Sequence, residues 1–289
     1  MLKPTPLRLF FPGLFTLAIV FAVPFAARAT DGVVEINHTC AVQTGCFAGD
    51  SAGYPITIDG TAGGSYRLTS NLIVPDEFTS GIVVSTSDIG IDLNNFTIIR
   101  SGCEGATTDC TPTSGSGTGI DRTSSSNRGI SVKNGSITGM GAYGVLLGDQ
   151  AGVTGLRVRW SRVDGILVNA GSIVSGNIAY QNGSDGIVAT GGSAVSGNTV
   201  YQNGALGISA SFGSTVSGNT VYRNDGDGIS TSSGTIVQRN VVRLNGGYGL
   251  NLGSQSAYLE NVITGNTTGT VNGGVNMSSN SCNGTTTCP

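Results

Sequence analysis

A stretch of 21 residues recurs four times without a gap between Gly165 and Tyr248, and this recurrence restricts the fold more than any other feature of the chain. The second and third copies begin at Gly186 and Gly207 and agree at thirteen of twenty-one positions. A fixed period of this length is typical of a solenoid, in which each unit buries its apolar face only against its neighbours. The sequence therefore predicts a stack of similar turns.

Apolar residues stand at fixed places in each copy. If the leading Gly is position 1, positions 2, 10 and 15 are β-branched or small, as in Ile187, Val195 and Val200. They lie in short runs between Gly, Asn, Ser and Asp, and no window shows the i, i+3, i+4, i+7 spacing of a helix. Three strands per repeat, around positions 2–4, 9–11 and 14–16, predict one coil of an all-β, three-faced parallel β-helix with coils stacked about 4.8 Å apart.

Asparagine recurs at two positions of the repeat. Asn tolerates the left-handed backbone of a sharp turn, and its amide can donate to one neighbouring coil while it accepts from the other. We therefore expect a ladder of stacked amides at position 13 and a second one at position 18. The position-13 ladder consists of Asn177, Asn198, Asn219, Asn240 and Asn261, and the position-18 ladder of Asn182, Asn203, Asn224, Asn245 and Asn266.

These repeats resemble those of the right-handed parallel β-helix proteins, the superfamily that includes pectate lyases. The resemblance lies in the hydrophobic–x–x–Asn–x–Val turn followed by Asn–x–x–x–Gly–Ile, and it covers most of the chain after residue 80. It implies a right-handed parallel β-helix of about nine coils with closed end caps. Lyases, hydrolases, epimerases, phage tailspikes and members without assigned activity share this repeat, so it implies a fold and not a function.

The chain begins with the pattern of a signal peptide in residues 1–29. Lys3 and Arg8 precede an apolar run, and Ala27-Arg28-Ala29 is an A-x-A cleavage site, with an uncleaved anchor as the alternative. We expect export to the periplasm, the cell surface or the medium, with no membrane segment after cleavage.

The net charge limits the partners of the exported chain. Without Lys3, Arg8 and Arg28 the chain keeps 11 of its 14 basic residues against 17 acidic ones, which gives a net charge of −6. This charge argues against nucleic-acid or anionic-membrane partners.

The six cysteines fall into three close pairs, Cys40/Cys46, Cys103/Cys110 and Cys282/Cys288. In an exported chain this spacing favours three local disulfides. A metal site is the alternative, but His38 is the only His in the chain. We expect no metal and no cofactor.

The repeat weakens toward both ends and is interrupted once. We predict an N-terminal cap over residues 30–80, the β-helix over 81–269 and a C-terminal cap over 270–289. Residues 101–118 are an inserted loop that contains Cys103 and Cys110. This loop either protects the early coils or forms the rim of a binding groove, because loops on rigid scaffolds often carry function.

Evident catalytic signatures are missing. The resemblance implies that enzymes of this fold carry acids and cations on the outer face of the first strand, where this chain has Leu146, Leu167, Val188, Ser209, Ser230 and Asn251. The nearest carboxylates, Asp164, Asp185 and Asp227 at position 21, precede the Gly of the next coil, as turn-capping residues do. The Asn-Thr-Asp, Asp-Asp, Gly-His-Gly and Asp-Pro-His motifs of the hydrolases and epimerases are absent. We therefore predict no catalytic residues.

An outward row at position 16 is the candidate binding surface. It consists of Arg159, Tyr180, Tyr201, Tyr222 and Arg243, with Trp160 and Arg223 beside it. Sugar rings pack on aromatic planes and bond to Arg and Tyr, so the row predicts a polysaccharide partner. The alternative is an aromatic ladder that only stabilises the sheet.

The expected function is an exported, non-catalytic scaffold that binds polysaccharide through this Tyr/Arg face. A polysaccharide lyase or glycoside hydrolase and a purely structural solenoid are the alternatives.

Overall fold

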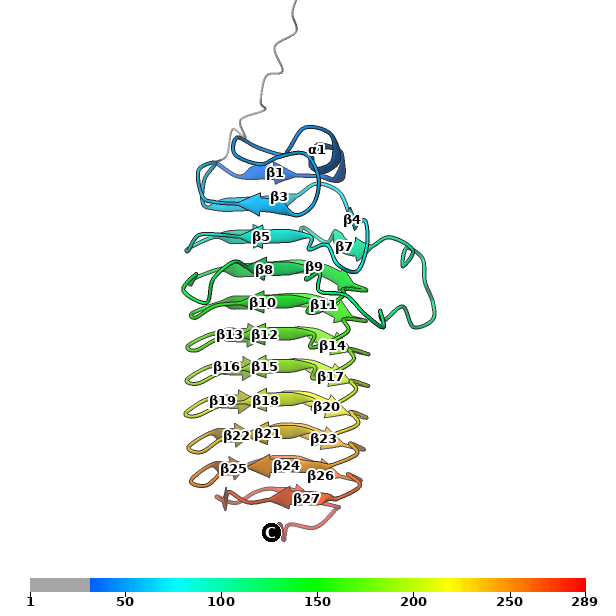
Figure 1. Cartoon of the computed structure of the whole chain (residues 1–289). Helices are drawn as coiled ribbons and strands as arrows, with labels where there is room; N and C mark the ends of the chain where they lie inside the picture. Colours follow the sequence, from blue (N-terminus) through cyan, green and yellow to red (C-terminus); the bar gives the residue numbers. More distant parts are fainter. Residues whose placement is uncertain (1–31) are drawn as a thin grey trace, which may run out of the picture.

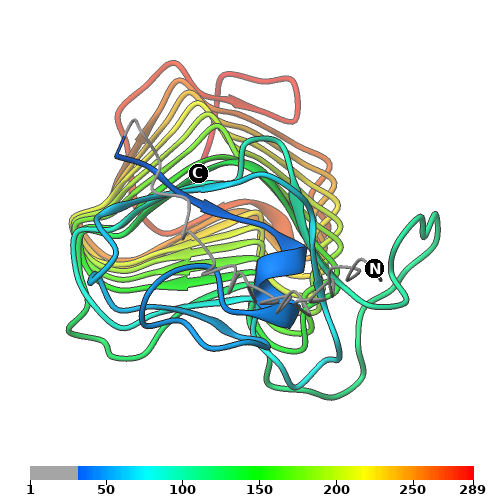
Figure 2. The same cartoon turned by 90° about the horizontal axis from the view of Figure 1, so that it is seen from above.

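The chain winds in stacked turns around one axis (Figure 1), and viewed along that axis the turns superimpose around a three-sided outline (Figure 2). The structure is a computed structural model, and it describes residues 32–289. The predicted signal peptide, residues 1–29, lies outside the described residues. All strand pairings in the turns are parallel, and 21-residue spacing brings equivalent residues together, as in the pairing of Ile187 with Ile208. The predicted all-β parallel β-helix is confirmed.

Each regular turn contains the three strands that the sequence predicted. In the turn that begins at Gly165 they are β12 (Ile166–Val168), β13 (Ile173–Ser175) and β14 (Ile178–Tyr180), at positions 2–4, 9–11 and 14–16. The first strands of all turns form one sheet of ten strands, so the solenoid has about ten turns where about nine were expected. The other members of this sheet are β2 (Ile56–Ile58), β5 (Ile82–Val84), β8 (Ile120–Arg122), β10 (Val145–Leu147), β15 (Ile187–Ala189), β18 (Ile208–Ala210), β21 (Ile229–Thr231), β24 (Tyr248–Leu252) and β27 (Gly269–Asn272).

The second and third strands of the turns form the other two faces. Two long strands, β9 (Ser131–Thr138) and β11 (Gly152–Arg159), run through the corner between these faces and join them into one sheet of 19 strands. The second face also contains β1 (Val34–Ile36), β3 (Ser65–Leu68), β6 (Gly90–Asp92), β16 (Ala194–Ser196), β19 (Thr215–Ser217), β22 (Ile236–Gln238), β25 (Ala257–Leu259) and β28 (Val275–Asn276). The third face contains β4 (Leu72–Val74), β7 (Thr97–Arg100), β17 (Thr199–Tyr201), β20 (Thr220–Tyr222), β23 (Val241–Arg243), β26 (Val262–Thr264) and β29 (Ser281–Cys282).

The interior consists of the inward columns at positions 2, 10 and 15. Ile187, Val195 and Val200, one from each face of a single turn, are fully buried. Burying one such side chain contributes about 1.5–3 kcal/mol before the entropy of ordering is subtracted. The Gly at position 1 leaves space for this packing, because a Cβ on Gly207 would lie 2.3 Å from Val221 Cγ1 and 2.5 Å from the Gly228 carbonyl oxygen.

A residue in the left-handed conformation bends the chain at the corners between the faces. The prediction assigned this conformation to the Asn of position 13, and that assignment is wrong. The left-handed residue is the one before it, Gly197 at φ 64° in one turn and Arg239 at φ 56° in another. Gln202, which precedes Asn203 at position 18, has φ 54° in the same way. The Asn side chain can point inward because the preceding residue makes the bend.

A short helix covers the N-terminal end of the solenoid. This helix, α1 (His38–Gln43), places Ala41 fully in the core, and the Cys40–Cys46 disulfide closes its end. Regular pairing begins inside the segment 30–80 that was predicted as the cap, because β2, β3 and β4 pair with β5, β6 and β7. That segment therefore contains a helical end piece and a full turn of strands.

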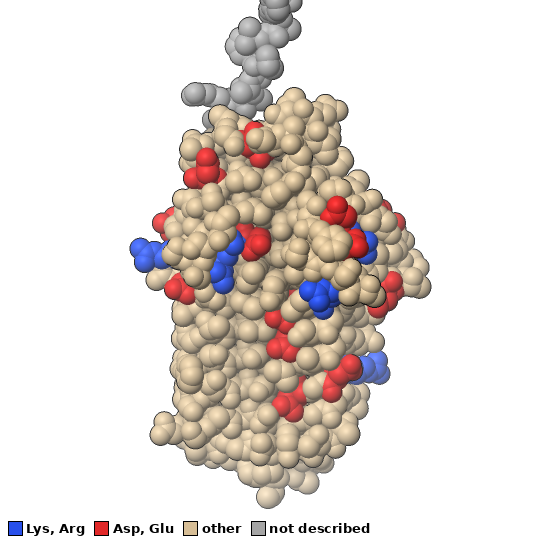
Figure 3. Space-filling view, in the orientation of Figure 1, with Lys and Arg blue, Asp and Glu red and all other residues tan. Residues whose placement is uncertain are grey.

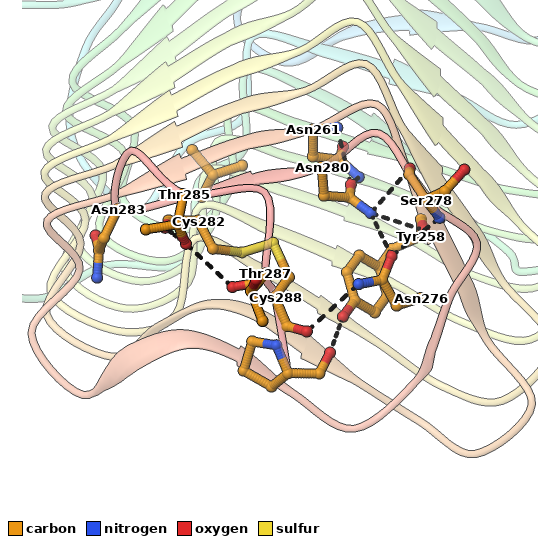
Figure 4. The surroundings of a disulfide bond; sticks show 12 residues. Tyr258, Asn261, Asn276, Ser278, Asn280, Cys282, Asn283, Thr285, Thr287 and Cys288 are labelled. Carbon is orange, nitrogen blue, oxygen red and sulfur yellow. Dashed lines mark hydrogen bonds between the residues drawn. A yellow bond between two sulfur atoms is a disulfide. The ribbon is translucent and has the colours of Figure 1, made fainter.

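The C-terminal end is closed by the Cys282–Cys288 disulfide, and Figure 4 shows its surroundings. Asn280 ends the position-13 ladder here. Its Oδ1 accepts from Asn261, and its Nδ2 donates to the carbonyl oxygen of Tyr258 at 3.2 Å and to Asn276 Oδ1 at 2.9 Å. Both the oxygen and the nitrogen of the Asn280 side-chain amide are thus hydrogen-bonded at the end of the ladder.

Residues 101–118 leave the third face after β7 and return before β8, and they project from the side of the solenoid (Figure 1). The Cys103–Cys110 disulfide closes the projecting part, so all three predicted cysteine pairs are confirmed. Within residues 32–289, no helix is long and apolar enough to cross a membrane.

Candidate functional site

The position-13 asparagines contact one another along the axis. Asn198 Nδ2 donates to Asn219 Oδ1 at 3.0 Å and to the Val174 carbonyl oxygen at 2.9 Å, and the Asn198 backbone N–H also donates to Asn219 Oδ1 at 2.9 Å. The same pattern repeats from Asn177 to Asn261. These side chains are buried and have no unused hydrogen-bonding group that faces solvent. The ladder therefore serves stability and leaves nothing for a ligand to bind.

Two further ladders accompany it at the other corners. At position 18, Asn203 Nδ2 donates to Asn224 Oδ1 at 2.9 Å, and Asn182 to Asn266 are connected in this way. At position 8, the hydroxyl of a buried Ser or Thr accepts the backbone N–H of the preceding turn, as Ser193 Oγ does for Ser172 at 3.1 Å. The sequence reasoning missed this third ladder because Ser also occupies outward positions of the same repeat, such as Ser196.

The Asp residues of position 21 bond to the backbone. Asp164 Oδ1 accepts the N–H of Asp185 at 3.0 Å, and Asp185 Oδ1 accepts the N–H of Leu206 at 2.8 Å. Burial raises the pKa of both carboxyl groups, and in Asp185 the neighbouring Asp164 raises it further. Asp227 caps Tyr248 in the same manner. This geometry is that of turn capping, and it points each of these carboxylates back at the chain.

The three tyrosines of position 16 form a stack. Tyr180 and Tyr201 have ring centroids 4.9 Å apart at an interplanar angle of 10°, and Tyr201 and Tyr222 are 4.9 Å apart at 5°. Arg243 places its guanidinium 5.0 Å from the centre of the Tyr222 ring. Both faces of Tyr201 and of Tyr222 are therefore covered within the row, whereas Tyr180 has one face covered, by Tyr201. The row is thus a stack of rings whose upstream end is Tyr180.

The arginines at the upstream end of the stack are not neutralised. Arg159 lies directly across from Tyr180 in the sheet, but its guanidinium lies 3.9 Å from the ring centre of Trp160. Trp160 itself is buried and left-handed, so it supports Arg159 and does not belong to the outer surface. Arg157 is exposed on the same strand. Among residues 32–289, neither Arg157 nor Arg159 has a carboxylate within ion-pair distance.

The third face is hollowed where these arginines meet the inserted loop. The groove there has a volume of about 440 Å³. Its floor consists of residues of β4, β7 and β9 and of the residue before β4. Its wall belongs to the loop, and its downstream end belongs to β11 and β14. The floor residues are Asn71, Ile73, Thr97, Ile99, Ser136 and Thr138, the wall residues are Glu104 and Gly105, and the end residues are Arg157, Arg159 and Tyr180.

The wall of the groove is fastened to the solenoid at both ends of the loop. Arg100 donates from Nε to the Gly139 carbonyl oxygen at 2.8 Å and from Nη2 to the Cys110 carbonyl oxygen at 3.0 Å. At the other end, Arg162 donates to the carbonyl oxygens of Gly141 at 2.7 Å and Gly115 at 3.0 Å. Because Cys103 is fully buried, the disulfide also holds the loop against the coil. The groove is thus a preformed feature of the fold.

The outward column of the first strands runs as predicted through Leu146, Leu167 and Val188. The structure adds Asp121, which pairs with Leu146 and was missed because the repeat is degraded before Gly144. Burial raises the pKa of the Asp121 carboxyl group, and its Oδ1 has no hydrogen-bond partner in the described part of the chain. No group of three or more His, Cys, Asp or Glu residues that could hold a metal ion occurs between residues 32 and 289.

Charge is distributed unevenly along the axis. The visible Lys and Arg side chains lie mainly over the upper turns of the solenoid. The lower turns in this view show a short line of acidic residues and one basic group at the right edge (Figure 3). Arg157 and Arg159 belong to β11, in the turn directly before the regular repeats that begin at Gly165.

The comparisons with known proteins agree with this architecture. Residues 143–287 match the family profile described as "Right handed beta helix region". The A-module of the Azotobacter vinelandii mannuronan C-5 epimerase AlgE4 is similar at 17% identity and a TM-score of 0.55, with 82% of this chain and 68% of that chain covered. The A-module of AlgE6 from the same organism gives 16% identity and a TM-score of 0.54, with 86% and 68% covered.

A periplasmic alginate epimerase is similar at 15% identity and a TM-score of 0.50, with 75% of this chain and 69% of that chain covered. No curated protein sequence matches the chain significantly. At these identities the structural likeness concerns the fold alone. Because the family profile covers half of the chain and the ten-stranded sheet continues the same coil upstream of residue 143, the chain belongs to the right-handed β-helix family.

Proposed function

We propose that this protein is an exported, non-catalytic β-helix that binds polysaccharide on its third face, in the groove between the inserted loop and the Tyr/Arg row. The main support for the proposal is the position of Tyr180, the ring at the upstream end of the tyrosine stack. One face of Tyr180 is covered by Tyr201, and Tyr180 also lines the groove. An aromatic ring at the end of an open groove, with guanidinium and hydroxyl donors around it, is suited to the C–H face and the hydroxyl groups of a sugar.

The floor of the groove supports the same ligand class. Ile73 supplies apolar area, and the partly exposed Thr97 and Ser136 supply hydroxyl groups. A mixed floor of this kind is suited to a pyranose ring, which has apolar faces and polar edges. The solved structures that share the fold include alginate and mannuronan epimerases, which are named for polysaccharide substrates.

Binding without catalysis is supported by the state of the carboxylates. Glycoside hydrolysis uses two carboxyl groups on opposite sides of the scissile bond. Within the described residues, Glu104 is the one carboxylate that lines the groove, and its Oε2 accepts the N–H of Gly102 at 2.6 Å. Asp164 and Asp185 are engaged with the backbone on another part of the surface.

Export is supported by the three disulfides, which form and persist in oxidising compartments. The predicted signal peptide in residues 1–29 is part of the same proposal.

The test is to incubate the purified chain with a panel of neutral and uronic-acid polysaccharides and to measure both retention and the products. We expect retention on at least one polysaccharide without unsaturated ends or new reducing ends. Release of either product would favour the alternative of a polysaccharide lyase or glycoside hydrolase. An absence of retention on every member of the panel would favour a purely structural solenoid.

A further inference from the structure

We infer that the groove takes an anionic sugar, one that carries a carboxylate or a sulfate ester, and that Arg157 and Arg159 are the residues that select it. This inference rests on the proposed function, since it specifies the chemistry of the ligand in the same groove. Four arginines lie near the loop, and they differ in what their guanidinium groups contact.

Arg100 and Arg162 are structural. The guanidinium of each donates hydrogen bonds to two backbone carbonyl oxygens. Together the two residues hold the loop 101–118 to the coil. Arginine in such a place satisfies carbonyl groups that the insertion leaves without strand partners. Neither of these two residues lines the groove.

Arg157 and Arg159 line the groove but have no such partner. Within residues 32–289 neither makes a hydrogen bond through its guanidinium nor has a carboxylate within ion-pair distance. The other charged group of the groove, Glu104, is turned to the backbone of its own loop. Two positive charges therefore remain uncompensated at one end of a groove, in a chain whose formal net charge is −3.

The position of Arg159 is also fixed. Its guanidinium lies 3.9 Å from the ring centre of the buried Trp160, so part of the conformational freedom of this long side chain is already lost before a ligand binds. Pre-organised guanidinium groups pair with carboxylates and with tetrahedral oxyanions through two parallel hydrogen bonds. Because Arg159 lies across from Tyr180, an anionic substituent on a sugar at that ring comes within reach of it.

This location differs from the outer face of the first strands, where the resemblance placed the acids and cations of the enzymes. The two faces share no strand, because the first strands form a sheet of their own. The anion-selective groove is thus a property of the insertion and of the third face next to it.

The experiment compares three probes made from one oligosaccharide: oligogalacturonate, its carboxyl-reduced neutral counterpart and a sulfated form of that counterpart. Calorimetric titration of the full exported chain should give binding of at least one anionic probe at least about tenfold tighter than binding of the neutral one. The double variant Arg157→Gln/Arg159→Gln should lose that difference. Arg157→Lys/Arg159→Lys, which keeps the charge without the planar donors, should keep part of it.

Arg128→Gln is the matched control, because it removes one exposed positive charge that does not line this groove, and its affinities should stay within about twofold of the wild type. Equal affinity for charged and neutral probes in the wild type, or an unchanged preference in the double Gln variant, would overturn the inference while the proposed function stands. An absence of binding to all three probes would overturn the inference, and failure on the whole polysaccharide panel would overturn the proposed function as well.

Discussion

The regular turns from Gly165 onward and the interrupted turns before them use the same fold in opposite ways. In the regular turns the repeated side chains satisfy one another: Asn bonds to Asn, Ser hydroxyls accept backbone N–H groups, and Tyr rings stack on Tyr rings. Before Gly165 a loop leaves the coil, and Arg157 and Arg159 have no ion-pair partner in the described chain. The tyrosine stack starts at Tyr180, in the first regular turn, and this ring lines the groove next to those arginines. A repeated residue tends to be matched by its own copy, and the groove lies beside the turns where the repeat breaks.

The largest effect should come from an interior position of the position-13 ladder. Asn219→Ala removes the bonds to Asn198, Asn240 and Val195 and leaves buried donors and acceptors unpaired in two adjacent turns. We expect the free energy of unfolding to fall by about 3 kcal/mol, because each buried orphan costs about 1–3 kcal/mol. Chemical denaturation checks this value. Ser217→Ala, an outward change in the same turn, is the control, and an equal loss for both variants would contradict the ladder.

Removal of the loop disulfide should act only on the interrupted turns. Cys103→Ala/Cys110→Ala should reduce stability by about 2 kcal/mol or less, since the bridge closes a short segment. Hydrogen exchange should speed up in residues 101–118, and retention on polysaccharide should fall, while the turns after Gly165 keep their protection. The corresponding change at Cys40 and Cys46, at the N-terminal end, should leave retention unchanged. Loss of protection throughout the solenoid would mean that the two regions are not independent.

Stacking predicts an order of stabilities within the tyrosine row. Tyr201 stacks on two rings and Tyr180 on one. Each aromatic pair contributes about 0.5–1.5 kcal/mol, so Tyr201→Ala should destabilise the chain by about 1 kcal/mol more than Tyr180→Ala. Thermal or chemical unfolding of the two variants under the same conditions gives this difference. The opposite order would show that the rings do not stabilise one another through the stack.

The smallest effect should be the pH dependence of stability that comes from the Asp residues of position 21, which cap the backbone of the next turn. Burial raises the pKa of Asp164 in the folded state, so the folded protein holds its proton more strongly than the unfolded chain does. Stability should therefore fall as pH rises from the ordinary carboxyl pKa through the raised folded value. Asp164→Asn can still accept the N–H of Asp185 and should remove part of this slope, with a small gain in stability at pH 7. An unfolding free energy measured from pH 4 to 7 that shows the same slope in both proteins would contradict this assignment.

Much of the fold was predictable because one period fixes many contacts at once. The three strands of each turn followed from the apolar positions, and the disulfides from the spacing of the cysteines. The left-handed residue was misplaced by one position because both Gly and Asn are common in turns, and the pattern does not say which of them bends. Asn280 was missed because its ladder spacing from Asn261 is 19 residues and not 21.

The candidate site was predictable only in part. Pairing along the axis places Tyr201 over Tyr222, yet whether the rings lie flat on the sheet or stack depends on side-chain rotamers that the period does not determine. The groove depends on the course of the loop 101–118, which has no repeat, and on the choice of Arg100 and Arg162 as its anchors. Asp121 was missed because the repeat is degraded before Gly144, so its place in the outward column could not be read from the period.

The most direct test of the account compares equivalent residues one turn apart, of which one lines the groove and the other does not. Retention of Tyr180→Ala and Tyr201→Ala should be measured on the same immobilised polysaccharide that retains the wild type. The account predicts that Tyr180→Ala weakens binding by about tenfold, whereas Tyr201→Ala stays within about twofold of the wild type. Equal losses, or a larger loss for Tyr201→Ala, would contradict the claim that binding occurs where the repeat is broken.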